Sequence, residues 1–141
     1  MKRGFSVIMP TYNEASFIGR GILSLQEQTF TNWELIIIND GSTDDTVFFI
    51  ADFLRDASIK YIENESNMGL GYALNQGIDA ASYKYIAYLP SDDFYYENHL
   101  ETLMDKFIKY SESILVFSGL RCYINDIMVS FPNTESKGLR D

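Results

Sequence analysis

A chain of 141 residues, 46% hydrophobic and 22% charged, fits one globular domain with a buried core and excludes a disordered polypeptide. Its 11 Lys and Arg residues against 20 Asp and Glu give a net charge of −9. This charge argues against nucleic-acid binding, since nothing would neutralise the phosphate backbone, but it admits a small anion that a cation bridges to the protein.

Short apolar runs alternate with segments of helical spacing along the chain. FSVIM (5–9) predicts a buried strand, and ASFIGRGILSLQEQ (15–28) predicts a helix with one apolar face. WELIII (33–38) predicts a second strand. DDTVFFIADFLRD (44–56) then predicts a helix that Ser42 or Thr43 would cap.

The second half of the chain continues this alternation. IKYIE (59–63) and YKYIAYL (83–89) predict two further strands, with a helix over 70–81 between them. ENHLETLMDKFIKY (97–110) predicts a fourth helix, and RCYI and IMVSF around Asn125-Asp126 predict a hairpin. The fold class is therefore α/β: one doubly wound, mostly parallel sheet with helices on both faces and a C-terminal β-hairpin.

Polar residues follow each of the four strands, as PTYNE (10–14), NDGSTDD (39–45), NESNMGLG (64–71) and PSDD (90–93). In a sheet of this kind, ligands bind beyond the carboxyl ends of the strands. With the strand order 3-2-1-4, Asp40 and the later acid pair would lie roughly 10 Å apart, two strand spacings. That is about the reach from a nucleoside's base to its phosphates. Carboxylates there suit Mg²⁺ or Mn²⁺, which bind through one or two carboxylates plus substrate phosphates.

Other phosphate-binding devices are missing from the sequence. It has no G-x-x-x-x-G-K-[ST] loop, and the glycines of GLGYALNQG lack the spacing of a dinucleotide fingerprint. A phospho-acceptor receiver domain would have its acid pair after the first strand, whereas here the pair follows the fourth strand.

Taken together, FSVIMPTYNE, QTFTNWELIIINDGSTDDT, NMGLGYALNQGI and YIAYLPSDD resemble a family 2 glycosyltransferase of the GT-A fold. The resemblance implies an inverting enzyme that uses a nucleotide-diphosphate sugar. It implies that Pro10, Thr11 and Tyr12 line the base pocket, with Tyr12 stacking on a uracil-like ring. Glu14 would lie near the nucleoside, and Asp40 would accept a hydrogen bond from the base N–H.

The same resemblance assigns the later motifs. Asn67 and Gly69 would border the nucleotide, Asp92 would bind the ribose hydroxyls, and Asp93 would bind the metal. The family often has an acid two residues before this pair, where the present chain has Pro90.

The general base that such an enzyme needs is not evident. The stretch after Asp93 looks too short for it and for most of an acceptor site. Asp126 is favoured as a turn acid and His99 as a helix-surface residue. We therefore expect residues 1–131 to form the nucleotide-sugar-binding domain and 132–141 to form a polar tail, with the chain truncated relative to a full-length enzyme.

The function that this resemblance implies is hexosyl transfer from a donor, UDP-linked by preference, to a carbohydrate, lipid or protein hydroxyl in polysaccharide biosynthesis. The alternatives are a non-catalytic or truncated nucleotide-sugar-binding module, a sugar-phosphate nucleotidyltransferase and a pure interaction domain. PTYNEASF lacks the Gly-rich basic loop of the nucleotidyltransferases.

The remaining expectations concern location and assembly. FSVIM is too short for a signal peptide, and no apolar run approaches a membrane span. A lone cysteine, Cys122, excludes an intrachain disulfide and is expected in the core. We expect a cytoplasmic protein, membrane-peripheral if full-length, with a homo-oligomer as an option through the hairpin edge.

Overall fold

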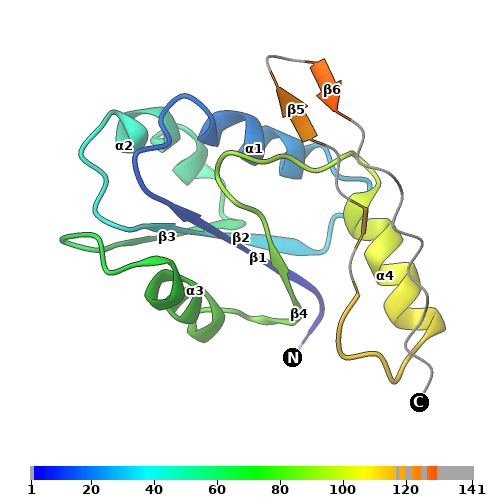
Figure 1. Cartoon of the computed structure of the whole chain (residues 1–141). Coiled ribbons are helices and arrows are strands. Elements are labelled where there is room, and N and C mark those ends of the chain that lie inside the picture. Colours follow the sequence, from blue (N-terminus) through cyan, green and yellow to red (C-terminus); the bar gives the residue numbers. More distant parts are fainter. Residues whose placement is uncertain (1, 117, 120–121, 125–126, 130–141) are drawn as a thin grey trace.

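The computed structural model describes residues 2–116, 118–119, 122–124 and 127–129 (Figure 1). Its main sheet is parallel, with the order β3-β2-β1-β4. The strands are β1 (Lys2–Thr11), β2 (Trp33–Asn39), β3 (Ile59–Glu63) and β4 (Tyr83–Tyr88). The predicted fold class and strand order are thereby confirmed.

Helices connect these strands, and a small hairpin follows them. The elements are α1 (Ile18–Gln26), α2 (Thr46–Ile50), the 3-10 helix η1 (Phe53–Arg55), α3 (Leu70–Asp79), α4 (His99–Lys109), β5 (Cys122–Ile124) and β6 (Ile127–Val129). The strands β5 and β6 pair antiparallel, as predicted, while Asn125 and Asp126 lie outside the described residues. The boundary expected at residue 131 also lies outside them.

The core has two unequal parts, one on each face of the sheet. The larger part joins side chains of β1 and β2 to α1, α2 and α4, and includes Phe5, Leu25, Ile37 and Leu103. The smaller part lies under α3 on the opposite face (Figure 1). On this face β4 is only partly covered, as the 44% exposure of Ile86 shows.

The helix predicted over 44–56 is wrong in its length and its cap. The structure has the five-residue α2 followed by η1, and in α2 only Thr46 and Ile50 are buried. Asp44 accepts the hydrogen bond from the Thr46 N–H, while Ser42 Oγ accepts one from the backbone of the loop after β1. Ser42, one of the two expected caps, therefore joins the loop after β1 to the loop after β2 instead of capping α2.

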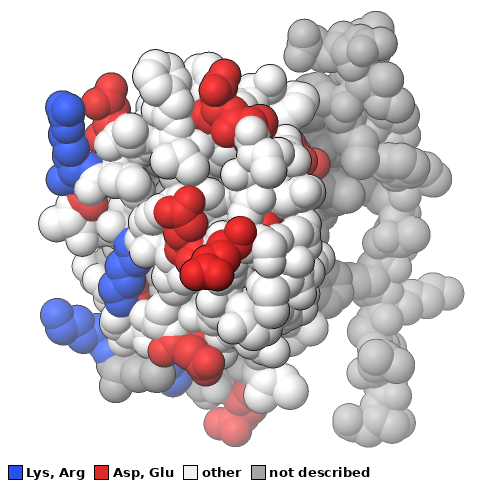
Figure 2. All heavy atoms as spheres, turned by 90° about the vertical axis from the view of Figure 1, so that its left-hand side faces the viewer, with Lys and Arg blue, Asp and Glu red and all other residues white. Residues whose placement is uncertain are grey.

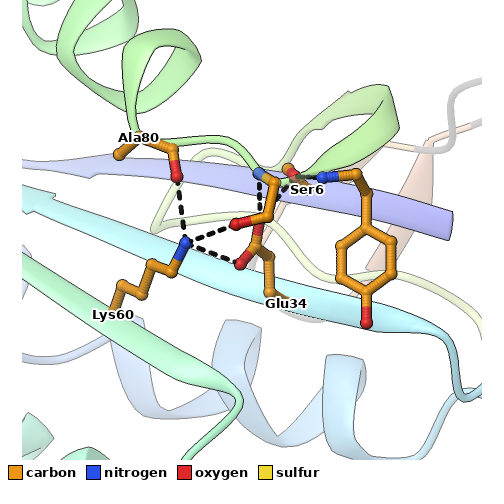
Figure 3. Close-up of polar contacts among 6 residues, drawn as sticks. Ser6, Glu34, Lys60 and Ala80 are labelled. Carbon is orange, nitrogen blue, oxygen red and sulfur yellow. Dashed lines mark hydrogen bonds and ion pairs between the residues drawn. The ribbon is translucent and has the colours of Figure 1, made fainter. Parts of the chain in front are cut away.

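A buried acid of β2 holds the amino ends of the strands together (Figure 3). Glu34 is 7% exposed and accepts hydrogen bonds from Ser6 Oγ at 2.7 Å and from the Ser82 N–H. Lys60 Nζ lies 2.8 Å from the other carboxylate oxygen and also donates to the Ala80 carbonyl. Three strands and the end of α3 thus meet at one carboxylate.

Replacement of Glu34 by Gln is expected to destabilise the fold by about 2 kcal/mol at pH 7, because hydrogen bonds to a charged group are lost. Burial alone would raise the pKa of Glu34, but hydrogen bonds from Lys60, Ser6 and Ser82 and the Lys60 charge hold it below its ordinary value. The stabilisation is therefore complete above the unfolded-state pKa, about 4.3, and is lost as the pH falls through the lower folded-state pKa.

Urea unfolding of the wild type and the Glu34→Gln variant at pH 7 and pH 3 would measure this. The exposed Glu65→Gln is the matched control and should change the free energy of unfolding little. A Glu34→Gln variant as stable as the wild type at pH 7 would contradict the expected role of the carboxylate.

Candidate functional site

The carboxyl ends of the strands meet at one edge of the sheet. Thr11, Asn39 and Glu63 are register partners at the ends of β1, β2 and β3. Figure 2 views the molecule from the left-hand side of Figure 1, toward which the strands point. Acidic side chains lie across this face in separate groups, and basic ones lie toward one side of it. The strand-end residues predicted from the sequence therefore belong to one acidic face.

The residues predicted for the base pocket differ in how accessible they are. Pro10 and Thr11 are buried within β1, whereas the Tyr12 side chain is 44% exposed and available for stacking. Thr11 Oγ1 is buried and has no hydrogen-bond partner among the described residues. An orphaned buried hydroxyl is uncommon in proteins and marks a position where a ligand or water is needed.

The loop after β1 is fastened to the loop after β2 through Asn13. This residue has a left-handed backbone, with φ of 59°, which Asn tolerates better than most residues. Its Oδ1 accepts hydrogen bonds from the N–H groups of Thr43 at 2.8 Å and Asp44 at 3.3 Å. Asp44 in return accepts one from the Ala15 N–H. Asn13 lies within PTYNE, but the sequence pattern predicts no role for it.

Asp40 connects the end of β2 to the loop after β3. It is 4% exposed and accepts hydrogen bonds from Asn64 Nδ2 and from the N–H groups of Met68 and Gly69, at 2.7 to 2.9 Å. Burial would raise the pKa of Asp40, but these hydrogen bonds hold it below the ordinary value. Asp40 is therefore an ionised acceptor, and its Oδ2 accepts one of these hydrogen bonds, from the Gly69 N–H.

The loop after β3 lies in close contact with the end of β2. Gly41 has φ of 74°, and a Cβ there would lie 2.6 Å from the Cα of Ser66. Asn67 Oδ1 accepts a hydrogen bond from the Gly69 N–H, which Asp40 shares. The structure therefore brings Asn67 and Gly69 beside Asp40.

Carboxylates of the β1 and β4 loops lie near each other. Burial raises the pKa of Glu14, and the charges of Asp92 and then Asp44 raise it further. Burial likewise raises the pKa of Asp93, with a further increase from Asp92 and an opposing effect of Arg20. Within the described ranges, no three His, Cys, Asp or Glu residues are grouped so as to hold a metal by themselves. A cation here would need ligand oxygens to complete its coordination.

The model of glycosyl transferase family 2 matches residues 6–127. The chain belongs to this family. Its relatives include UDP-Glc:alpha-D-GlcNAc-diphosphoundecaprenol beta-1,3-glucosyltransferase WfgD of Escherichia coli, 38% identical over 78% of this chain and 43% of the relative. Another is poly-beta-1,6-N-acetyl-D-glucosamine synthase of Staphylococcus epidermidis, 38% identical over 63% of this chain and 22% of the relative. The chain thus spans less than half the length of these relatives.

Solved structures agree with this membership. TarS 1-349 of S. aureus in complex with UDP-GlcNAc superimposes with a TM-score of 0.72 and 28% identity. The match covers 79% of this chain and 32% of that one. The resemblance noted in the sequence is thereby confirmed for the family and the fold.

A general base is not evident in the described part of this family 2 domain. His99, expected on the helix surface, is instead half-buried, with its ring stacked on Tyr95 at a centroid distance of 4.0 Å. Burial lowers its pKa, so it is neutral near pH 7. Asp126 lies outside the described residues.

Among the described helices, none is long and apolar enough to cross a bilayer.

Proposed function

We propose that this chain is the donor-binding part of an inverting glycosyltransferase that uses a UDP-linked sugar and builds a polysaccharide or glycolipid. The names of its relatives support the donor class, because WfgD is a UDP-Glc enzyme and TarS was crystallised with UDP-GlcNAc. The observation that carries the proposal is the single edge where Tyr12, Asp40 and the Asp92–Asp93 turn follow neighbouring strands.

In this proposal the base lies on Tyr12, and its N–H donates to Asp40 Oδ2. The buried Thr11 hydroxyl gains a partner from the ligand. The ribose hydroxyls donate to Asp92, which is exposed at the other end of the edge. These contacts fix the sugar's anomeric carbon beyond Asp93, where an acceptor can approach.

The acid pair fits a hard divalent cation. Asp93 and Asp92 carry adjacent carboxylate oxygens, and the diphosphate would supply the remaining ligands. Asp93 would hold Mg²⁺ or Mn²⁺, and the ion would stabilise negative charge on the leaving diphosphate.

The reaction forms a bond between the acceptor oxygen and the anomeric carbon as the bond from that carbon to the diphosphate breaks. The electron pair of the broken bond leaves with the diphosphate. The acceptor proton passes to a base outside the residues assigned here. The part of the chain described holds and orients the donor for this step.

Calorimetric titration of the chain with UDP, UDP-Glc and UDP-GlcNAc, each with and without Mn²⁺, tests the proposal. We expect UDP binding that Mn²⁺ tightens by at least about tenfold, which is 1.4 kcal/mol. GDP and ADP serve as matched controls and should bind more weakly. Failure of every uridine nucleotide to bind, or equal binding of GDP, would overturn the proposed donor.

A further inference from the structure

The segment that carries Asp92 and Asp93 contains neither helix nor strand between β4 and α4. One internal hydrogen bond closes its turn, from the Asp93 N–H to the Pro90 carbonyl at 3.0 Å. Its ends bond to β1 and α4, through Leu89 and Asn98, whereas the backbone between them bonds to α1 and the residues just after it. The position of the acid pair therefore depends on a helix that precedes it by some 70 residues in the chain.

Three side chains four residues apart make these contacts. Arg20 Nη2 donates to the Asp92 carbonyl at 3.1 Å. Ser24 Oγ accepts from the Tyr95 N–H at 3.1 Å, and Gln28 Nε2 donates to the Tyr96 carbonyl at 2.8 Å. Arg20 and Ser24 lie four residues apart on one side of α1, and Gln28, two residues after the end of α1, adds a third polar contact to the segment.

The helix backbone itself also lies against the turn. A Cβ added to Gly21 would lie 3.0 Å from the Asp93 carbonyl oxygen and 3.7 Å from that of Ser91. It would also lie 3.1 Å from Met9 Cε, which can move. The Asp93 carbonyl belongs to the turn and can move less than the Met9 side chain. A side chain at position 21 therefore displaces the turn or the helix by a few tenths of an ångström.

We infer that Arg20 and Gly21 are positioning residues that set the place of the Asp92–Asp93 turn, and hence of the Asp93 carboxylate relative to the donor's diphosphate. The inference rests on the proposed function, because it assumes that Asp93 binds the metal. Neither residue contacts the ligand in this account. Each acts through the backbone of the turn.

Because Arg20 is charged, the direction of the change in Mn²⁺ binding on its replacement tests this inference. Its guanidinium carbon lies 4.9 Å from the centre of the Phe94 ring, so it remains next to the acid pair. By Coulomb's law alone, removing a cation from this place would strengthen the binding of Mn²⁺. Loss of the anchor for the Asp92 carbonyl would weaken it. The direction of the change therefore separates positioning from electrostatics.

Gly21→Ala and its matched control Gly19→Ala form the first experiment. Both glycines lie in the first turn of α1, and a Cβ at Gly19 meets nothing within 4 Å. Alanine favours a helix over glycine, so neither change should lower the Tm on helix propensity grounds. We expect Gly21→Ala to weaken UDP binding with Mn²⁺ roughly tenfold while UDP binding without Mn²⁺ is unchanged. Gly19→Ala should match the wild type in both titrations.

Arg20→Met is the second experiment, because an exposed side chain can be changed without the risk of misfolding. We expect the Mn²⁺-dependent gain in UDP affinity to fall roughly tenfold, with the Tm close to that of the wild type. An unchanged or increased gain in Arg20→Met would overturn the inference for Arg20. An unchanged gain in Gly21→Ala would overturn it for Gly21.

The two proposals fail in different ways. If the wild-type chain shows no Mn²⁺-dependent UDP binding, the proposed metal site is wrong. If the wild type shows it and both variants retain it in full, the metal site stands and the positioning role of α1 is wrong.

Discussion

The Asp93→Ala chain is expected to bind UDP equally with and without Mn²⁺. At saturating Mn²⁺, its affinity should be roughly a hundredfold below that of the wild type, a loss of about 2.7 kcal/mol. The reason is that Asp93 is the carboxylate we assign to the metal, and the described residues contain no cluster that could replace it. Paired titrations of both chains with UDP, with Mn²⁺ and with EDTA, would measure the difference.

Asp105→Ala is the matched control for this prediction, because it removes an exposed aspartate of α4. It lowers the negative charge by the same amount but should leave both titrations unchanged. A Mn²⁺-dependent gain that persists in Asp93→Ala would remove Asp93 from the metal site. The same gain lost in Asp92→Ala would then move the assignment by one residue.

Asp40→Ala is expected to weaken UDP binding roughly tenfold to a hundredfold, to the same extent with and without Mn²⁺. A second effect comes from the hydrogen bonds that Asp40 accepts from the Met68 and Gly69 N–H groups. Their loss should destabilise the fold by about 1–2 kcal/mol, because the Met68 N–H loses its acceptor and the Gly69 N–H keeps only Asn67 Oδ1. Titration with UDP and urea unfolding of the same sample would separate the two effects.

Asp45→Ala on the same loop is the control, since Asp45 is exposed and its side chain makes no capping hydrogen bond to α2. It should change neither UDP affinity nor stability appreciably. If Asp40→Ala lost affinity only in the presence of Mn²⁺, Asp40 would belong to the phosphate end and the base would need another acceptor.

The strands and the edge where they end could be predicted from the sequence because strands buried on both faces are apolar at nearly every position. FSVIM and WELIII therefore identified the centre of the sheet, and the residues just after them identified the edge. The position of Asp40 and of the acid pair at that edge follows from connectivity alone. Their contacts do not, since Asp40 reaches Met68 across 28 residues of sequence.

The short helix α2 shows why the rest could not be predicted. Its sequence TVFFI has apolar residues at consecutive positions, which fit more than one helical face. In the structure Ile50 is fully buried, whereas Phe48 is 78% exposed. Which of them enters the core depends on how the loops before α2 are joined.

Asn13 makes several of the hydrogen bonds that join these two loops, and the sequence pattern gives no sign of this. Its left-handed backbone aims Oδ1 at N–H groups 30 residues away. Glu34 is a similar case, because a single acid in an apolar run could equally lie at a strand edge facing water. Only the placement of Lys60 and Ser82 around it shows that it is buried and paired.

The strand order also bears on how the chain folds during synthesis. The first strand made, β1, occupies an inner position, where Phe5 pairs with Trp33 on one side and with Tyr85 on the other. One side of β1 is thus completed early by β2, while the other waits until β4 has left the ribosome. During that interval an apolar strand has an open edge, which can pair with other nascent chains. Slow translation before residue 83 would therefore lengthen the time during which this edge is open to pairing.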